Sequence, residues 1–159
     1  MNLSKFLKNA FLVILASLVL SACATKKVTT GQMQGDVYTG TDTVKYLASG
    51  VKDRVFFATN ESVLTTASRD TLRKQAAWLR KNSNINVVLE GHADERGTRE
   101  YNLALGERRA NAAKDYLMTY GISGKRISTI SYGKEKPVNP GSSALAWSQN
   151  RRSVTVKVN

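Results

Sequence analysis

The chain contains a single cysteine, Cys23, and its position limits how an exported domain can be stabilised. Lys5 and Lys8 precede an uncharged apolar run, Ala10 to Leu20, and small residues stand directly before Cys23. That run is shorter than the roughly 20 residues of a transmembrane helix but fits the core of a secretory signal peptide. We therefore expect residues 1–22 to be a signal peptide. Because no second cysteine exists, the exported domain must fold without a disulfide.

The segment Leu20-Ser21-Ala22-Cys23 resembles the lipobox of bacterial lipoprotein signals, in which the cysteine becomes the lipidated first residue. The alternative is an ordinary cleaved signal peptide with an incidental cysteine. The resemblance implies acylation of Cys23, and several acyl chains together anchor a protein stably to a membrane. Ala24, rather than Asp, follows the cysteine, which in lipoproteins of this kind implies the outer membrane as destination.

Residues 24–50 are rich in Thr, Gly and small polar residues and show no persistent helical or strand period. We interpret residues 23–50 as a lipidated cysteine followed by a flexible tether, and residues 51–159 as the folded domain. The alternative is that part of the tether packs on the domain, with Val44 to Leu47 as the first candidate.

From Val51 onward the apolar pattern alternates between strand and helix. Leu72, Ala76 and Leu79 follow the helical period, and Gly121 suits the position that ends a helix. The segments expected as strands are 55–57, 87–89, 127–132 and 153–158, and those expected as helices are 66–82 and 101–120. This order predicts an α/β (α+β) two-layer sandwich of βαβαββ type, with two main helices packed on a small mixed sheet.

The densest charged segment, Glu90 to Asn102, leaves a buried strand and enters the second helix. Such a loop is a common ligand site, although a solvated charged turn is an equal alternative. Arg109 falls on the core-facing stripe of that helix, so it needs a carboxylate partner or must line a cavity. The nearest carboxylates are Asp94 and Glu95, and an internal salt bridge is the simpler interpretation. If Asp94 and Arg109 instead flank a pocket, the pair matches a zwitterion.

The sequence from Gly91 to Leu117 resembles the peptidoglycan-binding signature of OmpA-like domains. Asn150 to Arg152 and Ser131 to Pro137 resemble, within that family, the peptidoglycan-associated lipoproteins (Pal), as does the lipobox. The resemblance covers about 51–159. Gly106 stands where the wider family usually has Ser, although Pal-type sequences often have Gly. Ala58 and Asn60 stand where many Pal proteins have acidic residues, which leaves the contribution of the first strand's loop open.

The resemblance implies a domain that binds the meso-diaminopimelate stem peptide of peptidoglycan. By motif position, Asp94 receives the ammonium of that side chain and Arg109 its carboxylate. The remaining implied ligand-binding residues are Asn102 and Thr98 for hydrogen bonds, Phe57 as a pocket wall, and Arg151 for a more distal group.

The resemblance also implies partners and a place in the cell. Pal-type lipoproteins tether the outer membrane to the cell wall from the periplasmic side, and they bind TolB and other Tol proteins during cell division. The alternative is a protein-docking module of the envelope, whose charged loop binds a periplasmic partner instead of the wall.

Other classes of function have little support in the sequence. His92 is the only histidine and no serine is singled out as a nucleophile, so neither an enzyme, a metal site nor a cofactor is expected. We expect His92 to pack at a strand end. The formal charge of +12, which falls to +10 when Lys5 and Lys8 are removed, indicates an anionic partner. No nucleic-acid-binding motif accompanies that charge.

Overall fold

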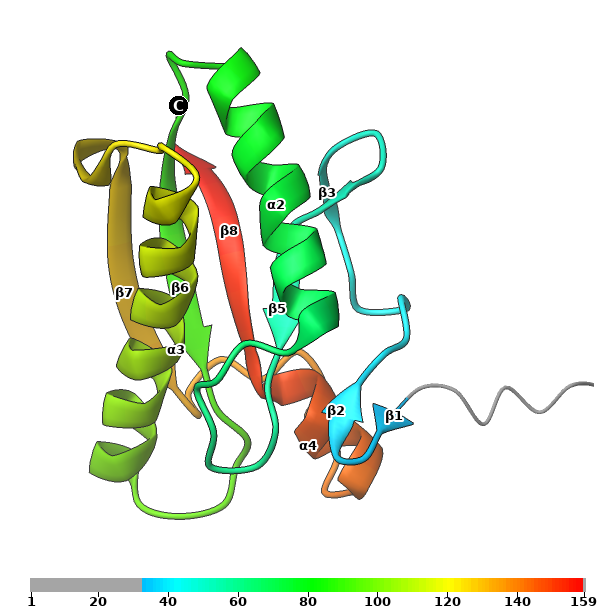
Figure 1. Ribbon diagram of the computed structural model, residues 1–159. Helices are drawn as coiled ribbons and strands as arrows, with labels where there is room; N and C mark the ends of the chain where they lie inside the picture. The colour runs from blue at the N-terminus through cyan, green and yellow to red at the C-terminus, as the bar shows by residue number, and fades with distance from the viewer. Residues whose placement is uncertain (1–32, 159) are drawn as a thin grey trace, which may run out of the picture. The chain divides into compact units, whose positions relative to one another are not determined.

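A four-stranded mixed sheet forms the centre of the computed structural model, which describes residues 33–158 (Figure 1). Its strands are β5 (Arg54–Phe56), β6 (Asn86–His92), β7 (Ile127–Gly133) and β8 (Arg152–Val158), in the order β5-β8-β6-β7. β6 is parallel to β7, whereas β8 is antiparallel to both β5 and β6. The carboxyl ends of β5, β6 and β7 therefore meet the start of β8 at one edge of the sheet.

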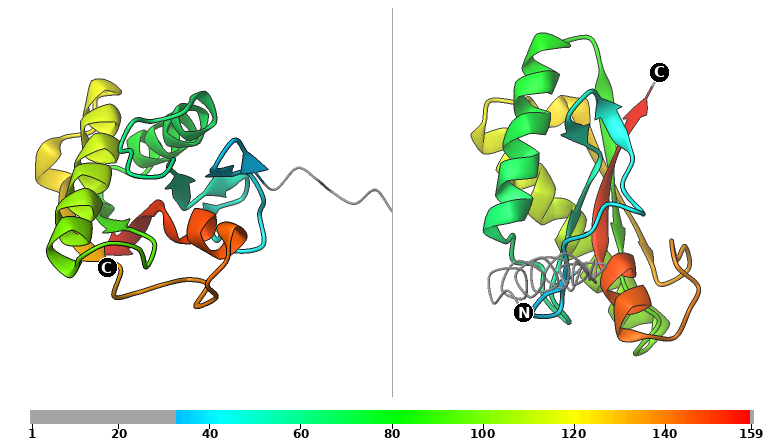
Figure 2. Two further views of the ribbon diagram at one scale, coloured as in Figure 1. Left: turned by 90° about the horizontal axis from the view of Figure 1, so that it is seen from below. Right: turned by 90° about the vertical axis from the view of Figure 1, so that its right-hand side faces the viewer.

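Two long helices, α2 (Thr66–Lys81) and α3 (Arg99–Thr119), cover one face of this sheet (Figure 2). Thr65 and Thr98 cap their first turns by accepting backbone N–H groups, and Gly121 follows α3 with a left-handed φ of 81°. The core between the two layers is apolar and draws on both helices and three strands. It comprises Val55, Phe57, Leu64, Leu72, Ala76, Leu79, Val87, Leu89, Ala110, Ala113, Leu117, Ile122 and Ile127. The predicted fold class is confirmed.

At one point the backbones of α3 and β6 approach so closely that no side chain fits between them. A Cβ built on Gly91 of β6 would lie 1.8 Å from the carbonyl oxygen of Gly106 on α3. The two glycines let the α3 backbone approach β6 directly. This contact fixes the height of α3 above the strand from which the charged loop departs.

Two short elements complete the second half of the fold. The 3-10 helix η1 (Gly124–Arg126) precedes β7, and α4 (Ala144–Asn150) precedes β8. The Ser143 hydroxyl caps α4 by accepting the N–H of Ala146 at 3.2 Å. The sequence patterns did not predict α4.

The segment before the sheet is folded, which corrects the prediction of a tether as far as Gly50. Within the described residues it forms two hairpins, β1 (Met33–Gln34) with β2 (Val37–Tyr38), and β3 (Tyr46–Ala48) with β4 (Val51–Lys52). Tyr38 is 2% exposed and Leu47 is 8% exposed, so both hairpins contribute side chains to the interior. The burial of Leu47 agrees with the alternative that Val44 to Leu47 packs on the domain. The expected signal peptide and the lipidation of Cys23 lie outside the described residues.

No helix within residues 33–158 is long and apolar enough to cross a membrane.

Candidate functional site

The charged loop that follows β6 lies at the sheet edge where the strands converge. The same edge receives the end of β5, residue Arg151 between α4 and β8, and the turn between β1 and β2. These segments are distant in the sequence, and their polar side chains meet around Asp94.

Asp94 is 7% exposed and is held by two arginines. Arg96 donates from its backbone N–H and Nε to Oδ1, at 3.1 and 3.0 Å, and from Nη2 to Oδ2 at 2.8 Å. Arg151 donates from Nη1 to Oδ2 at 3.3 Å. Burial by itself would raise the pKa of Asp94, but the hydrogen bonds from Arg96 and Arg151 outweigh it and lower that pKa. Asp94 is therefore an ionised carboxylate at neutral pH.

Arg109 has no exposed surface and is held by backbone carbonyls instead of a carboxylate. Its Nε donates to the oxygen of Glu61 at 2.8 Å, Nη1 to that of His92 at 2.8 Å and Nη2 to that of Ala58 at 3.0 Å. The internal salt bridge considered from the sequence is thus absent, since Arg109 forms no ion pair within the described residues. Burial, followed by repulsion from Arg151, lowers the pKa of Arg109 to about 10, which leaves it charged at neutral pH.

The loop after β5 is shaped to supply these carbonyls. Asn60 adopts a left-handed φ of 57°, a conformation that asparagine tolerates better than most residues. The turn is closed by a hydrogen bond from the N–H of Glu61 to the oxygen of Ala58 at 3.2 Å. Both Ala58 and Glu61 therefore present their carbonyls to Arg109.

Arg151 connects this cluster to the first hairpin. Its side chain is 3% exposed, and its Nε donates to the carbonyl of Phe57 at 3.1 Å. Its Nη2 donates to the backbone carbonyl of Asp36, whose carboxylate lies 3.8 Å away. Asp36 in turn accepts the N–H of Thr59 at 2.6 Å.

The charges of this cluster do not cancel. Three guanidinium groups, from Arg96, Arg109 and Arg151, face two carboxylates, from Asp36 and Asp94. Arg109 also uses three of its five N–H donors on neutral carbonyls, which leaves its charge without an anionic partner. A carboxylate ligand suits this excess of positive charge, and Asp94 offers an anion for a cationic group beside it.

Comparison with known sequences identifies the family. The profile of the OmpA family matches residues 56–151. The chain belongs to the OmpA family. The peptidoglycan-associated lipoprotein of Rhizobium meliloti is 46% identical in an alignment 149 positions long, which covers 91% of this chain and 85% of that protein. The peptidoglycan-associated lipoprotein of Agrobacterium fabrum is 43% identical in an alignment 162 positions long, which covers 97% of this chain and 90% of that protein.

Solved structures agree with this assignment. The crystal structure of the peptidoglycan-associated lipoprotein from Burkholderia pseudomallei superposes with a TM-score of 0.66 at 36% identity, covering 67% of this chain and 91% of that one. The C-terminal domain of Helicobacter pylori MotB superposes with a TM-score of 0.63 at 19% identity, which shows a shared fold alone. The OmpA family is not a family of enzymes, and this chain is accordingly not an enzyme.

Three further residues expected at the site of this OmpA family member lie around the same loop. Phe57 is fully buried, with the Arg109 guanidinium 5.3 Å from its ring centroid. Asn102 is 2% exposed, and its amide donates to the carbonyl of Arg96 at 2.8 Å. Thr98 accepts the N–H of Tyr101 at 3.2 Å as the cap of α3. In this structure Asn102 and Thr98 hold the shape of the loop around Asp94.

His92 packs at the end of β6, as expected. It is 1% exposed, stacks on Tyr132 with ring centroids 5.5 Å apart, and lies 3.4 Å from a carboxylate oxygen of Glu90. Burial, followed by the charges of Arg152, Arg54 and Lys136, lowers the pKa of His92 to about 3, so the ring is neutral at physiological pH. The described part of the chain brings together no group of three or more potential metal ligands from His, Cys, Asp and Glu.

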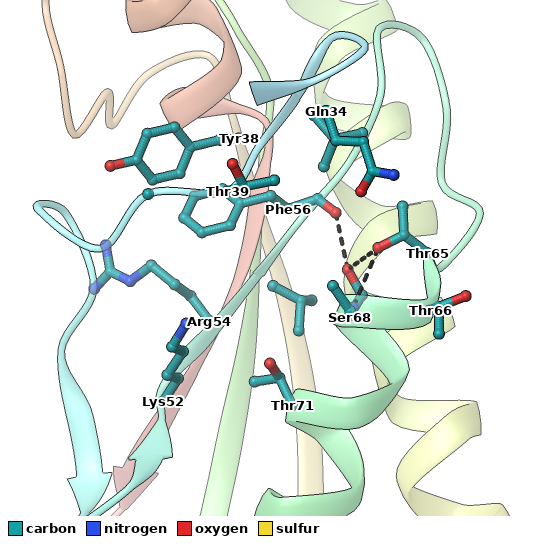
Figure 3. Close-up of a pocket in the computed structure, with 14 residues that line it drawn as sticks. Gln34, Tyr38, Thr39, Lys52, Arg54, Phe56, Thr65, Thr66, Ser68 and Thr71 are labelled. Atoms are coloured by element: carbon teal, nitrogen blue, oxygen red, sulfur yellow. Dashed lines mark hydrogen bonds between the residues drawn. The ribbon is translucent and has the colours of Figure 1, made fainter. Parts of the chain in front are cut away.

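Two cavities lie apart from Asp94 and Arg109. One, of about 440 Å³, lies between the first hairpin and the start of α2, where Tyr38 and Phe56 face Thr65 and Ser68 (Figure 3). The other, of about 710 Å³, is lined by residues 42–47 and by side chains of β6 and β8, including His92. Neither cavity is lined by a residue predicted to bind the ligand.

Three residues of the site were missed by the sequence analysis. Asp36 lies in the segment interpreted as a tether, and Trp147 lies in the unpredicted helix α4. Arg96 stands two residues after Asp94 within the recognised motif, and that spacing could have identified it as a partner of the carboxylate. The Arg96 guanidinium also lies 4.3 Å from the ring centroid of Trp147, whose Nε1 donates to Glu95 at 2.8 Å.

Proposed function

We propose that this protein binds the meso-diaminopimelate stem peptide of peptidoglycan at the cluster around Asp94 and Arg109, without catalysing a reaction. The observation that carries the proposal is a buried aspartate in a cluster of three arginines and only two carboxylates, in which the buried Arg109 forms no ion pair. The free end of a diaminopimelate side chain bears one ammonium and one carboxylate. Asp94 matches the first group, and the guanidinium groups of Arg109 and Arg151 match the second.

The supporting residues have different parts in this proposal. Phe57 forms an apolar floor beneath Arg109, and Arg151 lies between the Asp94 carboxylate and the first hairpin. Thr98 and Asn102 keep the loop in place, and we propose that their free polar atoms add hydrogen bonds to the peptide.

We further propose that the protein is a lipoprotein anchored in the outer membrane through Cys23, with its domain facing the periplasm. The lipobox-like segment before Cys23 supports this placement, as do the relatives named peptidoglycan-associated lipoprotein. Binding to the wall would then tether the outer membrane to it. We propose TolB and other Tol proteins as partners in maintaining envelope integrity during cell division, on the strength of the same similarity.

A calorimetric titration tests the binding site. The fragment 24–159 contains the whole described domain, and its ligand is the tripeptide L-Ala-γ-D-Glu-meso-diaminopimelate. We expect saturable one-to-one binding that Asp94→Asn and Arg109→Met each weaken by about 2–5 kcal/mol, because one end of the zwitterion would lose its partner.

The matched controls are Asp115→Asn and Arg108→Met, which change exposed residues of α3 and should leave the affinity unchanged. Arg109 supports the loop after β5, so its substitution also weakens the fold. A thermal unfolding transition, recorded for each variant, shows that the protein used for the titration is folded. Absence of binding by the parent would contradict the proposal and would favour the alternative of a protein-docking module. Unchanged binding by folded Asp94→Asn would contradict the assigned site.

A further inference from the structure

The Asp94 carboxylate already has as many hydrogen bonds as it can accept. Oδ1 receives the backbone N–H and Nε of Arg96, and Oδ2 receives Nη2 of Arg96 and Nη1 of Arg151. An ionised carboxylate offers about four lone-pair positions. An ammonium group therefore cannot bind Asp94 unless one of these donors leaves.

The contacts of the two arginines show which donor can leave. The Arg151 side chain is 3% exposed and is also held by the carbonyls of Phe57 and Asp36. The Arg96 side chain is 43% exposed, and its backbone N–H bond to Oδ1 does not depend on its guanidinium. Departure of the Arg96 guanidinium would free one position on each oxygen of Asp94.

The displaced guanidinium has other contacts that do not involve Asp94. It lies 4.3 Å from the ring centroid of Trp147, and its Nη2 lies 3.3 Å from the Thr59 hydroxyl. A cation beside an aromatic ring is stabilised at partly exposed positions. Movement away from Asp94 therefore does not leave the guanidinium without partners.

We propose that the guanidinium of Arg96 is an internal competitor that occupies the position of the ligand's ammonium and sets the affinity of the site for cationic groups. This inference rests on the function proposed above. A ligand that brings an ammonium must displace Arg96. Its apparent association constant is therefore the intrinsic constant multiplied by the fraction of molecules in which Arg96 is not bound to Asp94. A ligand with the same carboxylate but no ammonium does not meet this competition.

The test compares two tripeptides on three proteins by calorimetry. One tripeptide ends in meso-diaminopimelate, and the other carries 2-aminopimelate, which lacks the side-chain ammonium. The proteins are the parent fragment 24–159, Arg96→Ala and Arg99→Ala. Arg99 is a matched control, because its side chain is 63% exposed and pairs with Glu135 instead of Asp94. Arg96→Gln, which removes the charge but keeps a long polar side chain, serves as a second variant.

We expect Arg96→Ala and Arg96→Gln to bind the diaminopimelate peptide about three- to tenfold more tightly than the parent, the range set by a partly exposed ion pair. Their affinity for the aminopimelate peptide should not rise, and Arg99→Ala should resemble the parent with both peptides.

Weaker or unchanged binding of diaminopimelate by both Arg96 variants would overturn the inference and would make Arg96 a residue that positions Asp94. Equal tightening for both peptides would also overturn it. If the parent and every variant bound neither peptide, the proposed function itself would fail, and this inference with it.

Discussion

At the scale of single residues, the site is organised by buried charge. Arg109 is fully buried yet has only carbonyl partners, and Asp94 is enclosed by Arg96 and Arg151. Burying a guanidinium without a carboxylate is unfavourable unless hydrogen bonds compensate for the lost water. The three carbonyls around Arg109 provide that compensation without neutralising its positive charge.

His92 gives a prediction of pH dependence. Its folded-state pKa of about 3 lies below the ordinary value of 6.5, so the unfolded chain binds a proton that the folded chain does not between these two pH values. The stabilising contribution of His92 is therefore complete above pH 6.5 and declines as the pH falls toward 3, by up to about 1.4 kcal/mol per pH unit.

Urea unfolding of the parent and of His92→Phe between pH 7 and pH 4 measures this effect. The variant keeps a ring against Tyr132 but cannot be protonated, so its free energy of unfolding should fall less steeply with acid than that of the parent. Ring proton shifts of His92 in the parent that titrate near pH 6.5 would show instead that the side chain is accessible to water.

At the scale of elements, the position of α3 depends on the contact between Gly91 and Gly106. Gly91→Ala would place a methyl group against the Gly106 carbonyl of the facing helix, and backbone cannot move as a flexible side chain can. We expect a loss of about 3 kcal/mol in the free energy of unfolding, at the upper end for overpacking. Chemical denaturation provides the measurement.

Gly124→Ala is the control for this substitution, because its Cβ would meet only the end of the Met118 side chain at 3.3 Å. It should change stability by less than about 0.5 kcal/mol. Equal stability of the Gly91 and Gly124 variants would mean that α3 does not rest on β6 at this point.

The two long helices and β8 could be predicted because each is long enough for its pattern of apolar residues to repeat several times. α2 and α3 lie within two residues of the expected ranges, and the valine alternation correctly predicts β8. The hairpins before β5 were missed because each strand has only two or three residues, too few for a period of two to emerge. The seven residues of α4 are similarly too few to show a helical stripe.

The candidate site was predictable only in part, for a related physical reason. Arg109 stands out in the sequence because it is a charged residue on the core-facing stripe of a helix, and Asp94 because it is one of the two nearest carboxylates. The partners of Arg109 are backbone carbonyls of other segments, and Asp94 binds Arg151, which in turn contacts Asp36. Tertiary folding alone brings these groups to the same edge. No local pattern in the sequence encodes that convergence.

At the scale of the whole domain, the first hairpin belongs to the fold and to the site at once. Tyr38 packs edge-on against Phe56 with ring centroids 4.8 Å apart, and Asp36 of the same hairpin contacts Arg151 and Thr59. The domain therefore extends beyond the sheet and its helices to include these earlier residues. Removing the hairpin should affect both stability and the surroundings of Arg151.

Tyr38→Ala tests the structural part of this conclusion. Loss of a buried aromatic side chain should lower the free energy of unfolding by about 3 kcal/mol, whereas Tyr46→Ala, in the next hairpin but 54% exposed, should change it by less than about 0.5 kcal/mol. Thermal or urea unfolding of fragment 24–159 gives both values. If the two variants were equally stable, the segment before β5 would act as a tether in solution.

Binding to intact cell wall is the measurement that addresses the proposed function most directly. Fragment 24–159 would be sedimented with purified sacculi whose stem peptides carry meso-diaminopimelate, and with sacculi that carry L-lysine at the same position. We predict that the parent sediments with the diaminopimelate wall alone and that folded Asp94→Asn stays in solution with both, since only diaminopimelate presents the ammonium and carboxylate that the site matches. Equal sedimentation with both walls, or retention of Asp94→Asn on the diaminopimelate wall, would contradict recognition of a zwitterion at Asp94 and Arg109.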